Sequence, residues 1–300
     1  MGRDLADRIP ECRAVFDHAN DVLGFDLADI CFEGPREKLM KSSHAQPGIF
    51  VVSVAALTAL NMERPDVVFD ACAGLSSGEW AALYYAGVVS FEDTVKVLEA
   101  RGRFMQEACE ARPGGMVGVI GLDEEALRNV AEASGVEIAN FNSPGQTVLS
   151  GPAEGIETAE RMARDAGAKR AIRLEVAGAF HSSLMRPAAE KLSDYLSDVP
   201  LALPTIPVVS NVTGELHDTP EGIRSLMVEQ VTASVRWVSD VECLAGMGVT
   251  TYVECGPGKV LTGLVRRIDK EAGLHNIQDQ SALEAAARSL KKMDGVNCGT

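Results

Sequence analysis

The sequence from position 66 to position 80, DVVFDACAGLSSGEW, decides how the rest of the chain is interpreted. Its first half, Asp66–Cys72, is mostly apolar and predicts a strand, and the residues from Gly78 onward have the apolar spacing of a helix. The turn between them has the pattern Gly-x-Ser-x-Gly, with Ser76 at its apex. This order predicts a nucleophile elbow, in which the helix N-terminus presents N–H groups to a developing oxyanion. The simpler alternative is a glycine-rich turn with a solvated serine.

Length and composition indicate a large globular protein. The chain has 300 residues, 46% of them hydrophobic, which predicts one large domain or two lobes around a sizeable core. The formal net charge of −15 argues against a general nucleic-acid binder, although it does not exclude a local basic patch. The seven cysteines form no C-x-x-C pair and no metal-ligand spacing, so we expect reduced thiols and no metal site.

No targeting or membrane segment is evident in the sequence. The start lacks a basic region followed by an apolar core, so we expect no signal peptide. The longest nearly apolar run, Ile49–Leu60, is too short to span a bilayer. We therefore expect a cytoplasmic protein that does not enter the membrane.

The first third of the chain is predicted to be helical apart from the elbow. An amphipathic helix is expected over residues 3–23, and a strongly apolar helix over about 48–62, with Pro47 near its first position. After the elbow, Ser90 is a good N-cap for a helix that ends at about residue 111.

From residue 114 the pattern changes to short strands and helices. The expected order is β-α-β-β-α-β, a ferredoxin-like arrangement. Its strands are 116–121, 136–141, 146–150 and 170–176, and its helices are 123–134 and 153–167. Beyond it we expect helices at 182–196, at about 221–232 and up to about 268, with strands at 206–210 and 251–254.

These elements predict an α/β fold with a hydrolase-like, parallel-sheet large lobe and an inserted ferredoxin-like small lobe. The large lobe would comprise residues 1–112 and 181–290, and the small lobe residues 113–180. Residues 291–300 would form a tail.

A serine nucleophile needs a base, and His181 is the best candidate. It lies in Gly178-Ala179-Phe180-His181, where a strand gives way to a helix, and sites in open α/β sheets collect at such positions. The other histidines, His18, His44, His217 and His275, are most simply surface or structural residues, and a structural role is the alternative for His181 too. No aspartate stands out as a third member, so the ring of His181 is expected to bond a backbone carbonyl, giving a Ser–His dyad.

Arg101 is the candidate for binding an anion. It shares a helical face with Val97, Phe104 and Met105, so its guanidinium is expected to be partly buried. A buried arginine needs an anionic partner, and a substrate carboxylate matches its fork geometry. The alternative is that Arg101 and Arg103 are both solvated on the outer face of the helix.

Seven stretches carry a family resemblance, and they run in order to about residue 268. They are Gln46–Phe50, Gly74–Glu79, Arg101–Gln106, Asn140–Gln146, Gly178–Ser182, Ser210–Gly214 and Val253–Leu261. With these stretches the chain resembles the malonyl-CoA:acyl-carrier-protein transacylases of fatty acid synthesis and the related acyltransferase domains of polyketide synthases.

The resemblance implies a two-step transfer without a cofactor. Ser76 would attack the thioester of malonyl-CoA with His181 as general base, and the malonyl-serine would then pass to the phosphopantetheine thiol of acyl carrier protein. Arg101 would pair with the malonyl carboxylate, and the backbone N–H of Ser77 would form part of the oxyanion hole. The family also suggests a monomer.

Other site residues follow from the same resemblance. Gln46 and Asn142 would line the site, and a carbonyl near residues 235–237 would orient His181. Phe180 resembles the malonyl-selective pattern, in which an aromatic ring fills the space that an α-methyl group needs. Because the carrier protein is acidic, docking would need a basic patch. The candidate groups are Lys169, Arg170 and Arg173, or Arg266, Arg267 and Lys270.

Three departures from the family pattern leave alternatives open. Family members begin with an apolar strand and a Gly-Gln-Gly-Ser-Gln loop ahead of the stretch matching Met1–Ala6, and neither is present in this sequence. That loop supplies a second oxyanion donor, and loss of one donor lowers the rate by on the order of 10²–10³. Leu75 replaces a frequent histidine and Ser77 replaces an apolar residue. The alternatives are a reading frame begun at an internal start codon, an inactive truncated paralogue, and a serine thioesterase or other hydrolase.

Overall fold

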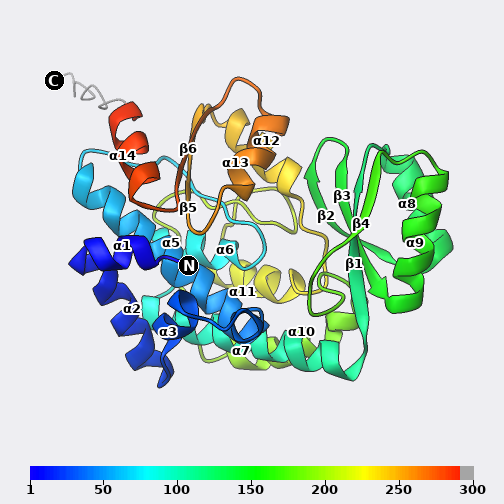
Figure 1. Ribbon diagram of the computed structural model, residues 1–300, viewed down its shortest axis with the longest axis horizontal. Coiled ribbons are helices and arrows are strands. Elements are labelled where there is room, and N and C mark those ends of the chain that lie inside the picture. The colour runs from blue at the N-terminus through cyan, green and yellow to red at the C-terminus, as the bar shows by residue number, and fades with distance from the viewer. Residues whose placement is uncertain (291–300) are drawn as a thin grey trace.

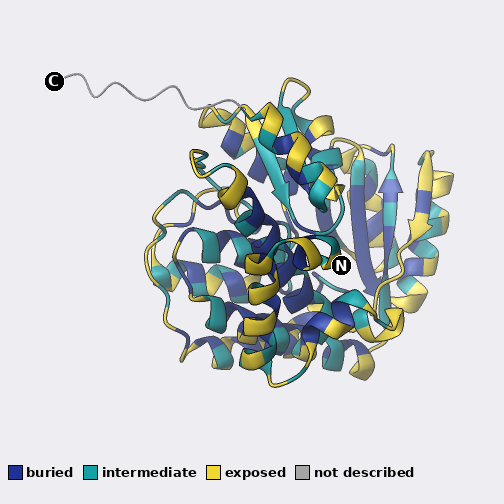
Figure 2. Cartoon of the chain, turned by 60° about the vertical axis from the view of Figure 1, so that its left-hand side comes forward, coloured by how far each residue is buried: buried dark blue, intermediate teal, exposed yellow. Residues whose placement is uncertain are grey.

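The structure is a computed structural model that describes residues 1–290. The predicted tail, residues 291–300, lies outside the described residues. Figure 1 shows a helix-rich body beside a four-stranded sheet that carries two helices on its outer side. Figure 2 shows the buried residues concentrated inside that body and along the central strands of the sheet. The predicted α/β class is confirmed.

Four short helices open the chain: α1 (Arg3–Arg8), α2 (Pro10–Leu23), α3 (Leu27–Phe32) and α4 (Arg36–Leu39). The prediction of one helix over residues 3–23 is wrong, because the chain is extended at Ile9, with φ −122° and ψ 108°. The ring of Pro10 disfavours the helical conformation in the residue before it, so α1 ends there and α2 begins with the proline.

Helix α5 (Ser42–Glu63) is the central helix of the body. It begins six residues before the predicted start, so Pro47 lies inside it, where it removes the N–H that would bond the Ser43 carbonyl. By length and composition α5 is the one described helix that could cross a membrane, but 61% of its apolar window is buried inside the protein. The apolar run Ile49–Leu60 is thus part of a longer helix than the sequence predicted, and this helix lies in the core.

Helix α7 (Phe91–Ala111) crosses α5 closely, and a glycine allows this approach. A Cβ atom on Gly102 would lie 2.2 Å from the Ser42 carbonyl oxygen, so no other residue fits without moving α5. The predicted cap of α7 is present, since the Ser90 hydroxyl accepts the N–H of Asp93 at 3.0 Å. This crossing brings Arg101 of α7 toward the N-terminal half of α5.

The four-stranded sheet has the order β2-β3-β1-β4, and all neighbouring strands are antiparallel. Its elements are β1 (Gly114–Ile120), α8 (Glu124–Ser134), β2 (Glu137–Ser143), β3 (Gln146–Pro152), α9 (Ala153–Asp165) and β4 (Arg170–Arg173). Helices α8 and α9 cover one face and share a separate apolar core with the sheet. The elements follow the predicted β-α-β-β-α-β order, although β4 ends three residues early. The division of the chain into two lobes stays a prediction.

The remaining elements return to the body. They are η1 (Ser183–Met185), α10 (Arg186–Leu196), α11 (Pro220–Glu229), α12 (Trp237–Gly246), β5 (Thr251–Cys255), α13 (Val260–Ile268), β6 (Gly273–Ile277) and α14 (Gln280–Ser289). Strands β5 and β6 form a two-stranded parallel sheet. The sequence did not predict α12, β6 or α14.

The strands predicted at 66–72 and 206–210 are not formed. In their place one parallel bridge joins Cys72 and Val208, with the Cys72 N–H bonded to the Pro207 carbonyl and the Val209 N–H to the Cys72 carbonyl. The segment therefore reaches the elbow as an extended chain held at one point. It leads directly into α6 (Gly78–Tyr85).

Candidate active site

Ser76 stands on a strained turn at the start of α6. Its φ of 56° is in the left-handed region, which disfavours residues other than glycine. The turn is closed by the Gly78 N–H bonding the Leu75 carbonyl at 3.0 Å. A Cβ atom on Gly74 would lie 2.0 Å from the Gly78 carbonyl oxygen, so the turn requires glycine at that position. The predicted elbow geometry is thus present, although the strand before it is missing.

His181 reaches Ser76 from the connection between β4 and η1. Its Nε2 lies 2.8 Å from the Ser76 Oγ, and its Nδ1 lies 2.8 Å from the backbone carbonyl oxygen of Gln230. Because a carbonyl can only accept, Nδ1 carries the proton, which leaves Nε2 free to accept the serine proton. The ring is 4% exposed and its backbone φ is 55°, a second strained position.

The carbonyl that orients His181 was predicted near residues 235–237, but the one 2.8 Å from Nδ1 belongs to Gln230, and the backbone of Ala233 adds a weaker hydrogen bond. The backbone of Val235 instead bonds β2, accepting from the Phe141 N–H and donating to the Ala139 carbonyl. Gln230, at the end of α11, supplies the carbonyl.

His181 is neutral near pH 7. Burial, and to a lesser extent the charge of Arg101, lower its pKa to about 4, while hydrogen bonding to the backbone of Gln230 and Ala233 opposes the shift. A neutral imidazole beside a hydroxyl has the protonation state that a general base needs.

Arg101 is 1% exposed, so the predicted burial is confirmed and the solvated alternative is wrong. One terminal nitrogen donates to Gln46 Oε1 at 2.6 Å. The other donates to Gln230 Oε1 at 2.9 Å and lies 3.3 Å from Ser76 Oγ. Burial lowers the Arg101 pKa to about 10, so the side chain stays charged at neutral pH.

The partners of this buried cation are all neutral. Within residues 1–290 no carboxylate forms an ion pair with Arg101, and its Nε has no hydrogen-bond partner. The nearby Glu79 carboxylate offsets only part of the cost of burying this cation, since the pKa of Arg101 remains lowered, and an anionic ligand next to Ser76 would relieve the rest.

The other predicted site residues differ in how close they come to Ser76. Gln46 contacts Arg101 directly. Ser77 follows the nucleophile, and its backbone N–H has no partner in the described part of the chain, as an oxyanion donor requires. Phe180 precedes His181 and packs on both apolar cores that meet there. Asn142 lies in β2, where its Oδ1 is buried without a partner, and no hydrogen bond joins it to Ser76 or His181.

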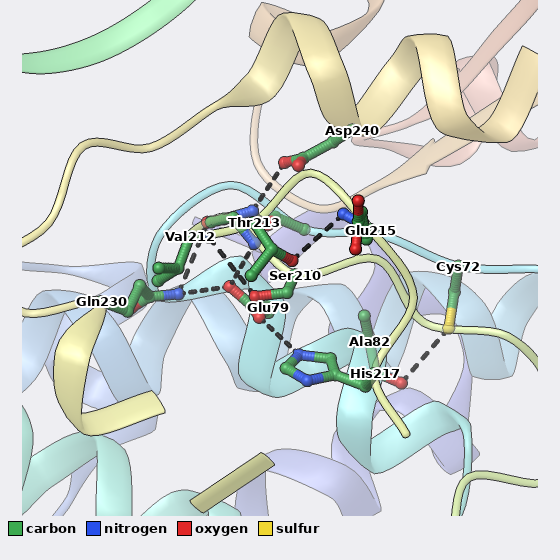
Figure 3. Close-up of polar contacts among 12 residues, drawn as sticks. Cys72, Glu79, Ala82, Ser210, Val212, Thr213, Glu215, His217, Gln230 and Asp240 are labelled. Carbon is green, nitrogen blue, oxygen red and sulfur yellow. Dashed lines mark hydrogen bonds and ion pairs between the residues drawn. The ribbon is translucent and has the colours of Figure 1, made fainter. Parts of the chain in front are cut away.

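A polar network that the sequence analysis missed is bonded to the Ser76 backbone through Asn211 and Gln230, and Figure 3 shows part of it. It consists of Glu79, Asn211, His217, Gln230 and Asp240, all buried. Figure 3 shows Glu79 between Gln230 and His217, with Asp240 above them. Of the surface and structural roles expected for His217, the structure shows the structural one, because its buried ring bonds the Glu79 carboxylate at 2.7 Å. The signal in the sequence was Glu79 itself, an acidic residue on an otherwise apolar helix.

A groove of about 520 Å³ opens beside the elbow, with Leu75, Ser76 and Ser77 among its lining residues. Its walls include Ala71 and Ala73 on one side and Val253 and Cys255 of β5 on the other. Alternate residues of a parallel strand bond the same neighbour. Cys72 bonds Pro207 and Val209, and β5 pairs with β6, so each segment is hydrogen-bonded to one neighbour among the described residues. The segment 66–72 forms a single bridge, between Cys72 and Val208.

The geometry suits acyl transfer to and from a serine. It combines a hydroxyl, a neutral base held in one tautomer, a free N–H after the nucleophile and a buried cation 3.3 Å from the hydroxyl. The cation would recognise an acyl group that carries its own carboxylate.

Comparison with known proteins gives the same picture. The model of the family described as "Acyl transferase domain" matches residues 1–294. A malonyl CoA-acyl carrier protein transacylase of Bacillus subtilis is 39% identical over 297 residues, covering 97% of this chain and 93% of the relative. The crystal structure of an acyl-carrier-protein S-malonyltransferase from Bartonella henselae superposes with a TM-score of 0.91 at 39% identity, covering 96% of this chain and 94% of the other. A malonyl-transacylase whose structure was solved in complex with its type II polyketide synthase acyl-carrier protein also matches. The TM-score is 0.91 at 39% identity, and the match covers 97% of this chain and 95% of the other.

Proposed function

This chain belongs to the acyl transferase family, and from that premise we propose that it moves a malonyl group from CoA to the thiol of acyl carrier protein. The observation that carries the proposal is the buried Arg101 guanidinium 3.3 Å from the Ser76 hydroxyl, which forms no ion pair with a carboxylate of residues 1–290. Such a cation binds a malonyl group by the carboxylate that a simple acyl group lacks.

In the first half-reaction, the Ser76 Oγ attacks the thioester carbonyl of malonyl-CoA while His181 Nε2 takes the hydroxyl proton. The carbonyl oxygen becomes an oxyanion that the Ser77 N–H stabilises. Collapse of the intermediate breaks the C–S bond, and His181 gives the proton to the leaving CoA thiolate. The products are malonyl-Ser76 and CoA.

The second half-reaction runs the same steps with the carrier protein. The phosphopantetheine thiol gives its proton to His181 and attacks the malonyl ester, and Ser76 leaves as the hydroxyl after His181 returns the proton. Arg101 holds the malonyl carboxylate throughout, with Gln46 and Gln230 fixing the guanidinium. No cofactor takes part in this scheme, and we propose a cytoplasmic monomer.

A serine hydrolase would use the same dyad, so the fate of the malonyl group separates the two functions. A hydrolase has no use for a carboxylate-binding arginine or a carrier protein. With malonyl-CoA and holo carrier protein present together, a transferase yields malonyl carrier protein faster than free malonate. A hydrolase yields free malonate whether or not the carrier is present.

The reaction is expected to be insensitive to pH between about 5 and 8. Protonation of His181 Nε2 removes the proton acceptor, so the rate falls only when the pH drops toward the pKa of about 4. Labelling of Ser76 by an uncharged fluorophosphonate tests this, since the probe does not titrate. An inflection near the ordinary histidine pKa of about 6.5 would contradict the assignment.

Phe180 is proposed to select malonyl over methylmalonyl groups. The ring is partly buried, packs against two apolar cores and precedes the catalytic histidine, so we expect it to occupy the space that an extra methyl group would need. Competing malonyl-CoA and methylmalonyl-CoA for Ser76 should give a malonyl preference of roughly tenfold or more, as expected for exclusion of one methyl group. Equal labelling would rule out this role.

The two basic groups proposed for carrier docking lie on one surface. Arg170 of β4 pairs with Ile120, Ile120 pairs with Gln146, and Arg267 donates to the Gln146 side chain at 2.7 Å. Lys169, Arg170, Arg266, Arg267 and Lys270 are all exposed, and we propose that they form one docking surface. Arg173 was predicted to belong to it but is paired with Glu160.

Removing two of these charges, with Arg266→Ala and Arg267→Ala combined, is expected to raise the KM for carrier protein by about three- to tenfold at low salt. The rate of Ser76 acylation by malonyl-CoA should stay the same. The control is Arg128→Ala, an exposed arginine on α8. If control and double variant have equal KM values, the carrier docks elsewhere.

A further inference from the structure

The Glu79 carboxylate is fully buried at the start of α6 and accepts three hydrogen bonds. Its Oε1 lies 2.7 Å from His217 Nε2. Its Oε2 accepts the Gln230 side-chain amide at 2.5 Å and the Asn211 backbone N–H at 3.2 Å. A charged group in this position is expensive unless such bonds satisfy it, so the network constrains every partner it touches.

Asn211 holds the backbone of the elbow. Its Oδ1 accepts the N–H of Ser76 at 2.6 Å, and its Nδ2 donates to the Gly74 carbonyl at 2.8 Å. These bonds fix the chain on both sides of Leu75. They offset the unfavourable left-handed φ of Ser76, which the local sequence alone does not stabilise.

Gln230 connects Glu79 to the remaining groups of the site. Its side-chain amide donates to the Ser76 carbonyl at 3.0 Å as well as to Glu79. Its side-chain oxygen accepts from Arg101, and its backbone oxygen accepts from His181 Nδ1. A shift of Gln230 would therefore move the nucleophile, the base and the cation together.

Two buried groups close the network behind Glu79. His217 Nδ1 has no partner among residues 1–290, so only Nε2 ties this ring to the network. Asp240 accepts the Asn211 Nδ2 at 2.8 Å, and burial together with the charge of Glu79 raises the Asp240 pKa to about 9. Asp240 is thus uncharged at neutral pH and does not compete with Glu79 for the donors.

We propose that Glu79 is a positioning residue for the transfer reaction. Through Asn211 and Gln230, its one carboxylate fixes the Ser76 backbone, the His181 ring and the Arg101 guanidinium in their working geometry. The inference rests on the proposed function only in taking Ser76 as nucleophile and His181 as base.

The test measures the rate at which a small, uncharged fluorophosphonate labels Ser76. This probe needs the Ser76–His181 geometry but has no carboxylate for Arg101 and no carrier protein. Glu79→Ala is expected to slow labelling by about tenfold or more, measured per folded molecule. Glu79→Gln should recover to within about threefold of wild type. Its amide oxygen can accept from Asn211 and Gln230, and its NH₂ can donate to His217 Nε2 once the proton of that ring moves to the free Nδ1.

The matched control is Glu254→Gln, which removes a carboxylate bonded to the Leu261 and Thr262 N–H groups at the start of α13. It touches neither Asn211 nor Gln230, so labelling should stay within about twofold of wild type. If Glu79→Ala does not fold, Asn211→Ser is measured instead, because it removes the acceptor of the Ser76 N–H. Labelling of Ser76 is again expected to slow by about tenfold.

Wild-type labelling rates in a folded Glu79→Ala variant would overturn the inference. A Glu79→Gln variant as slow as Glu79→Ala would overturn it too, since hydrogen bonding would not restore the site. If the wild-type chain itself fails to label, the nucleophile assignment fails and not the role of Glu79, so the two failures are distinct.

Discussion

Ser76→Ala is expected to abolish malonyl transfer to the carrier protein. The variant lacks the oxygen that forms the covalent intermediate, and His181 and Arg101 cannot replace it. Loss of a nucleophile from such a constellation lowers rates by on the order of 10⁴–10⁶. Initial rates of malonyl carrier protein formation, followed by mass spectrometry, measure the effect.

Ser77 provides the control for this substitution. Ser77→Ala keeps the backbone N–H and does not change the contact between Ser76 and His181, so it should still form the covalent adduct. If Ser77→Ala loses the adduct and Ser76→Ala keeps it, the nucleophile has been assigned to the wrong serine.

Arg101→Ala is expected to lower kcat/KM for malonyl-CoA by on the order of 10²–10³, the usual effect of removing one member of a buried charge pair. Acetyl-CoA has no second carboxylate, so its much lower rate should change by less than about tenfold. Measuring both substrates in parallel separates lost recognition from a damaged site. Arg101→Lys should recover little, because lysine cannot bond Gln46 and Gln230 as the guanidinium fork does.

Arg103→Ala is the matched control, since Arg103 lies on the same helix but is half exposed and pairs with Glu99. It should leave both substrates nearly unchanged. If Arg101→Ala lowers the acetyl-CoA and malonyl-CoA rates equally, Arg101 does not bind the malonyl carboxylate and the proposed substrate class is wrong.

The sequence allowed prediction of the groups that have distinctive chemistry. Ser76, His181 and Arg101 are far apart in the chain and meet in the structure, because each lies where an unusual residue type interrupts an apolar or glycine-rich pattern. The orienting carbonyl of Gln230 could not be predicted in this way. Every residue has a carbonyl, and only the fold determines which one faces the histidine.

Local patterns also failed where tertiary contacts decide the outcome. Residues 66–72 have the composition of a strand but pair at one point only, the bridge from Cys72 to Val208. His217 lies in a polar turn by sequence, yet its ring is buried in the structure. It is hydrogen-bonded there to the carboxylate of Glu79, more than a hundred residues away in the chain. Pro47 suggested a helix start, but packing of α5 against α2 and α7 extends the helix beyond it.

The intact mass of the protein after brief incubation with malonyl-CoA is the most direct test of the central claim. The account predicts one malonyl adduct on the wild-type chain, none on Ser76→Ala, and complete discharge of the adduct when holo carrier protein is added. A folded wild-type chain that forms no adduct would contradict the account and favour an inactive relative. An adduct that the carrier protein does not discharge, and that water slowly removes, would point to a hydrolase.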